Sequence, residues 1–376
     1  MKKVHITLVG GQPVPVYLGI KDNGQANPVI LVCSPQSKTE AERIKEQFPK
    51  RNILVKECSP VELDDIENLA IGLFKDYSDY EKTINFTSGT KLWSLTFFRI
   101  FNQDKNSHFI YIDQNNQIID ILSKKSHVGT INTLKRFELY GTPLTSFRTL
   151  EEYNVEDLLV AKEIERLRNR NRSEFIRLTG NRKLSEMNEK GVLFTDRKSR
   201  LEYSFDERWA SIKLYTDETF MTKEFHCQHL FDILFNSGWF ELKTAIELNN
   251  NERINNIWLN CEFTDIEGNP KNEIDIIAEL DNRLLFVECK TMIHDSTDID
   301  KFKSALRNFS GTSTTGIFVT NDMPNEYSLP RYEHAMEKCK DNDILTFNFS
   351  LWRSNPLETT NLEAIVNEHI QLQNKR

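Results

Sequence analysis

The first third of the chain alternates between short apolar segments and amphipathic segments. The apolar segments, all between Val4 and Ser123, are "VHITLV", "PVILVCS", "NILVKEC", "KTINFT", "HFIYID" and "QIIDIL". The segments between them, such as "TEAERIKEQF" and "VELDDIENLAIGLFKDY", place apolar residues at helical spacing. Strands that alternate with helices predict a parallel α/β sheet of the Rossmann type, here with an antiparallel hairpin at its end.

The length of the chain predicts more than one domain. A chain of 376 residues suggests two or three domains, each with its own core. The segment "LYGTPLTSF" (139–147) interrupts the alternation and marks a domain edge. We therefore expect an N-terminal domain over residues 1–145, a charged and mostly helical connector over 146–222, and a second α/β domain over 223–376.

Composition indicates where such a protein works. No segment approaches the roughly 20 apolar residues that a membrane helix needs, and "MKKVHITLVGG" is typical of a strand and a turn rather than a signal peptide. The six cysteines form no C-x-x-C pair, as expected for reduced thiols. We therefore expect a cytoplasmic protein with no membrane partner. The net charge of −8 means that a nucleic acid would have to meet a local basic cleft.

The segment "NEIDIIAELDNRLLFVECKT" (272–291) predicts a β-hairpin, because two apolar runs flank a short Asp-Asn turn. With a two-residue loop, Leu280 faces Arg283. In that register Asp275 lies opposite Glu288, and Glu273 lies opposite Lys290. All four charged side chains then project from one face of the hairpin, with opposed Cβ atoms about 5 Å apart.

Two carboxylates so placed need a counter-charge. A divalent cation with hard oxygen ligands, Mg²⁺ or Mn²⁺, would supply it. The predicted metal ligands are Asp275, Glu288 and the carbonyl of Cys289, and Lys290 would orient water or stabilise charge on a phosphate. The alternative is a solvated face of an edge hairpin, where such charges are common.

Three loops that follow predicted strands form a second constellation. In a doubly wound sheet such loops converge on one crevice, and "INFTSGTKLWS" adds a helix start, a Gly, hydroxyls and a Lys, which suit an anion. A Walker motif is missing, which argues against ATP hydrolysis. Three ordinary turns are the alternative. The predicted ligand-binding residues are Gly10, Gly11, Gln12, Ser34, Pro35, Gln36, Ser37, Thr87, Ser88, Gly89, Thr90 and Lys91.

Both constellations resemble known families. "FTSGTK" resembles the T-G-G-T-K signature of CARF domains, the Rossmann-like sensors of cyclic oligoadenylates, with Ser88 in place of the first Gly. "EID…VECK" resembles the core of PD-(D/E)XK nucleases, with Ile274 in place of the usual Pro. "GWFELKTAIEL" (238–248) resembles the first helix of that core, which implies that Glu241 is a fourth catalytic residue; a plain packing helix is the alternative.

The joint pattern resembles the CRISPR ancillary nucleases of type III systems, which cyclic tetra-adenylate activates. That resemblance implies a homodimer that shares one cyclic ligand across its twofold axis. It also implies metal-dependent cleavage of single-stranded DNA and RNA, and nicking of supercoiled duplex DNA. Two alternatives stay open. One is a constitutive restriction-like or repair endonuclease whose N-terminal domain is not a nucleotide sensor, and the other is a regulator with a degraded nuclease fold.

Three further groups of residues are ambiguous in the sequence. Arg166, Arg168, Arg170 and Arg172 recur at every second position, which favours a solvated helix over a phosphate-binding one. Lys301, Lys303 and Arg307 follow the predicted catalytic strand and are candidates for contacts with a nucleic-acid backbone. His226 and His229 are predicted to be structural.

Overall fold

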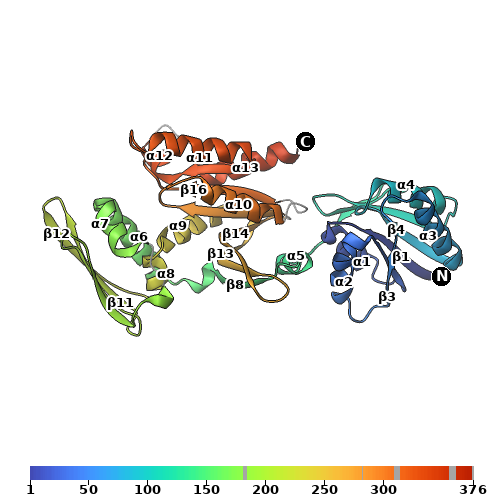
Figure 1. Ribbon diagram of the computed structural model, residues 1–376, viewed down its shortest axis with the longest axis horizontal. Coiled ribbons are helices and arrows are strands. Elements are labelled where there is room, and N and C mark those ends of the chain that lie inside the picture. The colour runs from blue at the N-terminus through green and yellow to red at the C-terminus, as the bar shows by residue number, and fades with distance from the viewer. Residues whose placement is uncertain (181–183, 282, 309–313, 355–360, 375–376) are drawn as a thin grey trace.

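The computed structural model describes residues 1–180, 184–281, 283–308, 314–354 and 361–374. They form three sheets, and the chain is elongated (Figure 1). A seven-stranded sheet lies at one end of the molecule, a six-stranded sheet in the middle and a four-stranded sheet at the other end.

The N-terminal sheet has the predicted Rossmann-type architecture. Its strands are β1 (Lys2–Val9), β2 (Val29–Cys33), β3 (Ile53–Glu57), β4 (Tyr80–Asn85), β5 (Ser107–Ile112), β6 (Gln117–Asp120) and β7 (Ser126–Val128). The first five are parallel in the order β3-β2-β1-β4-β5, and β6 and β7 extend the sheet antiparallel. The prediction of a parallel sheet with a terminal hairpin is therefore confirmed.

Four helices cover the two faces of this sheet: α1 (Pro13–Asp22), α2 (Lys38–Glu46), α3 (Leu63–Asp76) and α4 (Lys91–Phe101). Along β2, Val29 and Leu31 join one core with residues of α1 and α2, whereas Ile30 and Val32 join another with residues of α3 and α4. A strand that is buried on both faces must be apolar throughout, and this explains the continuous run in "VILVC".

A short helix and one strand carry the chain out of the N-terminal domain. The helix α5 (Thr133–Leu139) ends at Gly141, which adopts φ +68°, and the amide of Thr142 donates to the carbonyl of Phe137. The strand β8 (Leu144–Thr149) then pairs with β13 (Ile254–Thr264) at the edge of the central sheet. Phe137 belongs to the core of the central sheet, but Leu139 belongs to that of the N-terminal sheet.

The expectation of a mostly helical connector is wrong. Two helices, α6 (Val155–Arg170) and α7 (Arg172–Thr179), are followed by a four-stranded antiparallel sheet. Its strands are β9 (Lys190–Phe194), β10 (Arg200–Ser204), β11 (Trp209–Thr216) and β12 (Thr219–His226). Along β11, Ala210, Ile212 and Leu214 are buried in alternation. These residues and those of α6 share one apolar core with the C-terminal domain.

The turns explain why this sheet was missed. The loop between β11 and β12 holds Asp217 at φ 45° and Glu218 at φ 67°, the backbone of a type I′ turn. Such turns are usually signalled by Asn or Gly, which are missing here. Arg208 and Lys198, also with positive φ, lie in the two preceding turns and carry no such signal either.

The central sheet belongs to the C-terminal domain and has the order β17-β16-β15-β14-β13-β8. The strands β13, β14 and β15 are antiparallel, whereas β16 and β17 continue parallel to β15. The strands are β13 (Ile254–Thr264), β14 (Pro270–Leu280), β15 (Arg283–Lys290), β16 (Thr314–Thr320) and β17 (Leu345–Asn348).

The helices of the C-terminal domain pack on both faces of this sheet. They are α8 (Leu230–Leu234), α9 (Gly238–Asn249), α10 (Thr297–Asn308), α11 (Leu329–Asp341), α12 (Phe349–Ser354) and α13 (Leu362–Asn374). Residues of α9 and α13 join the core of one face, and residues of α10 and α11 join that of the other. Within the described ranges, no helix is long and apolar enough to cross a membrane.

Two loops of the N-terminal domain approach each other closely. A Cβ atom added to Gly10, at the end of β1, would lie 2.7 Å from the amide nitrogen of Gly89, which follows β4. Gly89 itself adopts φ +98°, and a Cβ there would lie 2.9 Å from Cε3 of Trp93. Contacts below 3 Å with a backbone atom force the backbone to move. Glycine at position 10 is therefore required to keep the two loops together.

We expect Gly10→Ala to lower the free energy of unfolding by about 1–3 kcal/mol, the usual cost of overpacking. Gly11→Ala is the matched control, because no atom lies within 4 Å of a Cβ at that position. Thermal and urea unfolding of both variants measure the effect. Equal stability of the two variants would contradict the steric argument.

Candidate active site and candidate ligand cavity

The hairpin of β14 and β15 has the predicted register. Five pairs run from Leu280 opposite Arg283 to Ile276 opposite Val287. Asn282, half of the predicted turn, lies outside the described residues. Just beyond the last pair, the amide of Cys289 donates to Oδ2 of Asp275 at 2.6 Å. Asp275 therefore lies beside the peptide that joins Glu288 to Cys289.

The charged residues of the hairpin line one cavity of about 810 Å³, which we call the hairpin cavity. It gathers Asp275 and Glu288 with Lys290 and Cys289, and Glu273 also lines it. On its other side Glu273 pairs with Glu262 of β13. The helix α9 contributes Glu241, so the side chain singled out in "GWFELKTAIEL" does reach the hairpin. Basic side chains also line the cavity: Arg168, Lys271, Lys290 and Lys301.

Burial and mutual repulsion make the three carboxyl groups hard to ionise. Burial, and then the charge of Asp275, raises the pKa of Glu288 to about 8. The same two causes raise the pKa of Glu241 well above its ordinary value. Burial also raises the pKa of Asp275. In a buried acidic cluster of this kind the ionised carboxylates repel one another, and a bound cation would offset that repulsion.

Lys290 supplies part of the counter-charge. Its Nζ lies 2.6 Å from Oε1 of Glu288. Burial lowers the pKa of Lys290, but the charges of Asp275 and Glu288 outweigh burial and raise the pKa above its ordinary value. Lys290 therefore faces more than one carboxyl group in this cavity, and it does not balance their charge alone.

The donors of the hairpin cavity fit a hard divalent cation in their chemistry. They are carboxylate oxygens and, at Cys289, a backbone carbonyl, the ligands that Mg²⁺ and Mn²⁺ prefer. Within the described ranges, however, no three Asp, Glu, His or Cys side chains gather closely enough to hold a metal ion. The metal ligands Asp275, Glu288 and Cys289 therefore stay a prediction.

The prediction of a solvated arginine helix is wrong for two of the four arginines. Arg168 is only 3% exposed, stacks on Trp239 at 5.4 Å and donates to the carbonyl of Thr291 at 3.2 Å. Arg172 donates to the same carbonyl at 2.8 Å and to Asp322 at 3.1 Å. In contrast, Arg166 and Arg170 are exposed. The sequence signal was available, because Arg168 continues the apolar stripe of Ala161 and Ile164.

The two histidines have different surroundings. Nδ1 of His229 lies 2.9 Å from Oδ2 of Asp157, and its backbone amide donates to Oδ1 of the same carboxylate at 2.9 Å. This contact ties α6 to the start of α8 and fits the predicted structural role. His226 is exposed on β12.

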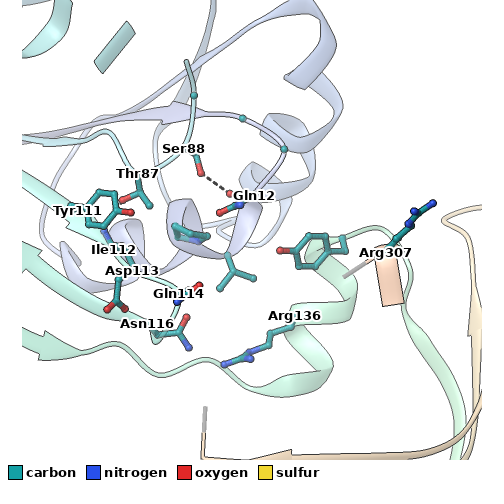
Figure 2. Close-up of a pocket in the computed structure, with 16 residues that line it drawn as sticks. Gln12, Thr87, Ser88, Tyr111, Ile112, Asp113, Gln114, Asn116, Arg136 and Arg307 are labelled. Carbon is teal, nitrogen blue, oxygen red and sulfur yellow. Dashed lines mark hydrogen bonds between the residues drawn. The ribbon is translucent and has the colours of Figure 1, made fainter. Parts of the chain in front are cut away.

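A second cavity, of about 780 Å³, lies at the carboxyl ends of the N-terminal strands (Figure 2). We call it the N-terminal cavity. Six of the predicted ligand residues line it: Gly10, Gly11, Gln12, Thr87, Ser88 and Gly89. The hydroxyl of Ser88 donates to the carbonyl of Gln12 at 2.8 Å, which joins the loops after β1 and β4.

The other six predicted ligand residues lie outside the lining of this cavity. The loop 34–37 closes on itself, because the side chains of Ser34 and Ser37 form a capping box and Ser37 donates to the carbonyl of Val9. Thr90 caps α4 by accepting the amide of Trp93, and Lys91 is exposed at the first position of that helix. Pro35 and Gln36 belong to the same short 3₁₀ turn as Ser37.

Several residues that line the N-terminal cavity were not predicted from the sequence. Tyr111, Asp113, Gln114 and Asn116 follow β5. The rule that selected the loops after β1 and β4 applies equally to the carboxyl end of "HFIYID" and would have found them. Nothing local in the sequence points to the remaining ones, which are Arg136 and Tyr140 near α5 and Arg307 of α10.

The raised pKa of Glu288 predicts a pH-dependent stability in metal-free protein. Because the folded pKa lies near 8 and the unfolded one near about 4.3, the fold favours the protonated carboxyl. Its contribution is complete below about pH 4 and is lost as the pH rises to about 8. In EDTA, the melting temperature of Glu288→Gln minus that of wild type should therefore increase from about pH 5 to about pH 8. The exposed Glu252→Gln is the control, and a pH-independent difference would contradict the assignment.

Comparisons with known proteins agree with this geometry. Residues 4–137 match the family described as the Card1 CARF domain, and residues 231–334 match the family described as the Card1-like endonuclease domain. No curated protein matches the chain.

Solved structures that share the fold include the following three. Can2 from Sulfobacillus thermosulfidooxidans, in complex with cyclic tetra-adenylate, is 19% identical with a TM-score of 0.67, over 97% of this chain and 98% of that one. VC1899 from Vibrio cholerae is 13% identical with a TM-score of 0.65, over 99% and 98%. A type III CRISPR defence DNA nuclease activated by cyclic oligoadenylate is 14% identical with a TM-score of 0.52, over 85% of this chain and 45% of that one.

Apart from Tyr140 and Arg307, the residues that line the N-terminal cavity lie within the first matched segment. Glu241, Asp275, Glu288 and Lys290 lie within the second. The chain is therefore a two-domain protein that joins a CARF domain of the Card1 family to an endonuclease domain of the Card1-like family.

Proposed function

We propose that this protein is a metal-dependent endonuclease of type III CRISPR defence that cyclic tetra-adenylate activates. The observation that carries the proposal is the presence of two separate cavities on one chain. One is lined by glycines and hydroxyls at strand ends, and the other by five carboxyl groups, three lysines and an arginine. Each lies in the domain whose family name fits its chemistry.

The activating ligand would bind in the N-terminal cavity. Gly10, Gly11 and Gly89 let a ligand approach the backbone, and α1 starts directly after Gln12. Pro13 and Pro15 have no N–H, so the start of α1 offers a phosphate group the free amide of Val14. A ring of four equivalent nucleotides suits a twofold axis, so we propose a homodimer in which two N-terminal domains share one ring. Can2, bound to cyclic tetra-adenylate, supports this choice of ligand.

The hairpin cavity would hold Mn²⁺ or Mg²⁺ between Asp275, Glu288 and the carbonyl of Cys289. The metal would polarise the scissile phosphodiester and lower the pKa of a bound water. Lys290 would move from Glu288 to the phosphate and stabilise the charge that develops there. Glu241 would hold a second water or the metal's hydration shell. The proposed substrates are single-stranded DNA and RNA, and supercoiled duplex DNA for nicking.

We expect Glu288→Ala and Lys290→Ala each to lower the cleavage rate by at least about 100-fold, because each removes a group that acts on the developing charge. Affinity for cyclic tetra-adenylate should be unchanged, since its cavity lies in the other domain. Labelled single strands with Mn²⁺ measure cleavage, and titration calorimetry measures binding. Glu252→Ala is the control. Near-normal cleavage by either variant, or cleavage that persists in EDTA, would remove the hairpin from the mechanism.

Cleavage by wild-type protein should require cyclic tetra-adenylate, because a sensor that binds the active arrangement more tightly shifts the equilibrium toward it. The decisive comparison is cleavage with the cyclic ligand, with linear tetra-adenylate and with neither. Equal rates in all three would instead favour a constitutive restriction-like or repair endonuclease. Ligand binding without any cleavage would favour a regulator with a degraded nuclease fold.

A further inference from the structure

One helix lines both cavities. Four residues of α10 line the hairpin cavity, namely Asp298, Lys301, Phe302 and Ala305. Arg307, in the last turn of the same helix, lines the N-terminal cavity. A helix of 12 residues is about 18 Å long. The two cavities are therefore joined by a rigid element, although each opens in a different domain.

Arg307 lies where a ligand could meet it. Figure 2 shows Arg307 on the side of the N-terminal cavity opposite Tyr111. Its side chain is exposed, so it is able to adopt other rotamers without disturbing a core. The guanidinium group binds phosphate in a bidentate manner, and its charge does not depend on pH in the working range. The C-terminal domain thus contributes a phosphate-binding group to the cavity of the N-terminal domain.

Across the cavity from this arginine, the loop after β5 carries a buried amide without a hydrogen bond and also contacts the C-terminal domain (Figure 2). Asn116 is 7% exposed, and its Nδ2 has no hydrogen-bond partner among the residues that the structure describes. The adjacent Asn115 accepts a hydrogen bond from Arg283 at 3.1 Å. Arg283 begins β15, the strand that carries Glu288 and Lys290. The loop at the floor of the cavity is therefore in contact with the catalytic hairpin.

We propose that a phosphate of the activating ligand binds Arg307, so that the ligand bridges the two domains and acts directly on α10. This inference rests on the proposed function. A ligand shifts a conformational equilibrium only through a contact that differs between the two states. A ligand held by the N-terminal domain alone would act on the C-terminal domain only indirectly, through the packing of α5. Arg307 provides it, and α10 carries any displacement to Asp298 and Lys301 at the hairpin cavity.

From the sequence, Arg307 was predicted instead to contact a nucleic-acid backbone. Lys301 fits that role, because it lines the hairpin cavity, whereas Lys303 lines neither cavity. Arg307 lies at the rim of the N-terminal cavity instead (Figure 2). The position of Arg307 in the N-terminal cavity thus favours the activator over the substrate as its partner.

The test compares full-length wild type, Arg307→Ala and Arg331→Ala. Arg331 is an exposed arginine of the neighbouring helix α11, so its removal changes the net charge equally. Titration calorimetry with cyclic tetra-adenylate measures affinity, and cleavage of a labelled single strand at saturating ligand measures activation. We expect Arg307→Ala to bind the ligand about tenfold more weakly, the usual loss for one charged hydrogen bond. At saturation it should also cleave more slowly than Arg331→Ala, because the ligand no longer contacts α10.

The outcomes separate this inference from the proposed function. If wild type binds and responds to the ligand but Arg307→Ala matches Arg331→Ala in both measurements, the bridge is wrong and the sensor function stands. If Arg307→Ala weakens cleavage without changing ligand affinity, Arg307 contacts the substrate and the bridge is again wrong. If wild type neither binds nor responds to the ligand, the proposed function fails and the bridge fails with it.

Discussion

The register of the β14–β15 hairpin brings Asp275 beside the peptide that joins Glu288 to Cys289, with Lys290 at the end of the same strand. The strand β15 is hydrogen-bonded on both sides, to β14 antiparallel and to β16 parallel, so that Glu288 and Lys290 have little freedom to move along the sheet. A slip of one residue would turn both side chains to the opposite face. Burial and the charge of Asp275 raise the pKa of Glu288, so that the ionised form of this carboxyl is disfavoured in the metal-free protein. The apolar residues on both sides of the hairpin, such as Val287 and Phe286, hold it in place.

The connector, residues 146–222, also helps to hold the β14–β15 hairpin in place. Arg168 and Arg172 both donate to the carbonyl of Thr291, the residue directly after Lys290, and so fix the end of β15. Oε1 of Glu165, also on α6, accepts from Lys243 of α9 at 2.8 Å and from Arg353 of α12 at 2.7 Å. Because Lys243 lies two residues after Glu241, this ion pair helps to orient the helix that brings Glu241 to the cavity. The connector is therefore part of the framework of the active site rather than a spacer.

Local patterns in the sequence predicted the parts of the structure that depend on neighbours in the chain. The two-residue turn and the alternation of "IDIIAEL" and "RLLFVEC" determined the hairpin register, and the strand–helix alternation determined the N-terminal sheet. The sheet of β9 to β12 was missed, because Asp217 and Glu218 form a turn that other residue types usually form. Arg307 could not be assigned to the N-terminal cavity from the sequence, because its partners there lie more than 150 residues earlier in the chain.

The boundary between the two domains is a packed surface, and this affects how a signal can cross it. On α5, the ring of Phe137 packs edge-on against Phe263 of β13 at 5.0 Å, inside the core of the C-terminal domain. Its neighbour Arg136 lines the N-terminal cavity. Packed interfaces of this kind tend to have a few discrete arrangements rather than a continuous range.

The helix α5 at one side of the boundary and α10 at the other therefore restrict how the domains can move relative to each other. A flexible linker would allow the N-terminal domain to bind ligand with no effect on the hairpin. Phe137 of α5 belongs to the core of the C-terminal domain, and Arg136 of α5 lines the N-terminal cavity. A ligand that changes the shape of the N-terminal cavity therefore also changes the packing of α5 against β13. Coupling between the cavities is then a consequence of shared elements, and it requires no separate transmitting device.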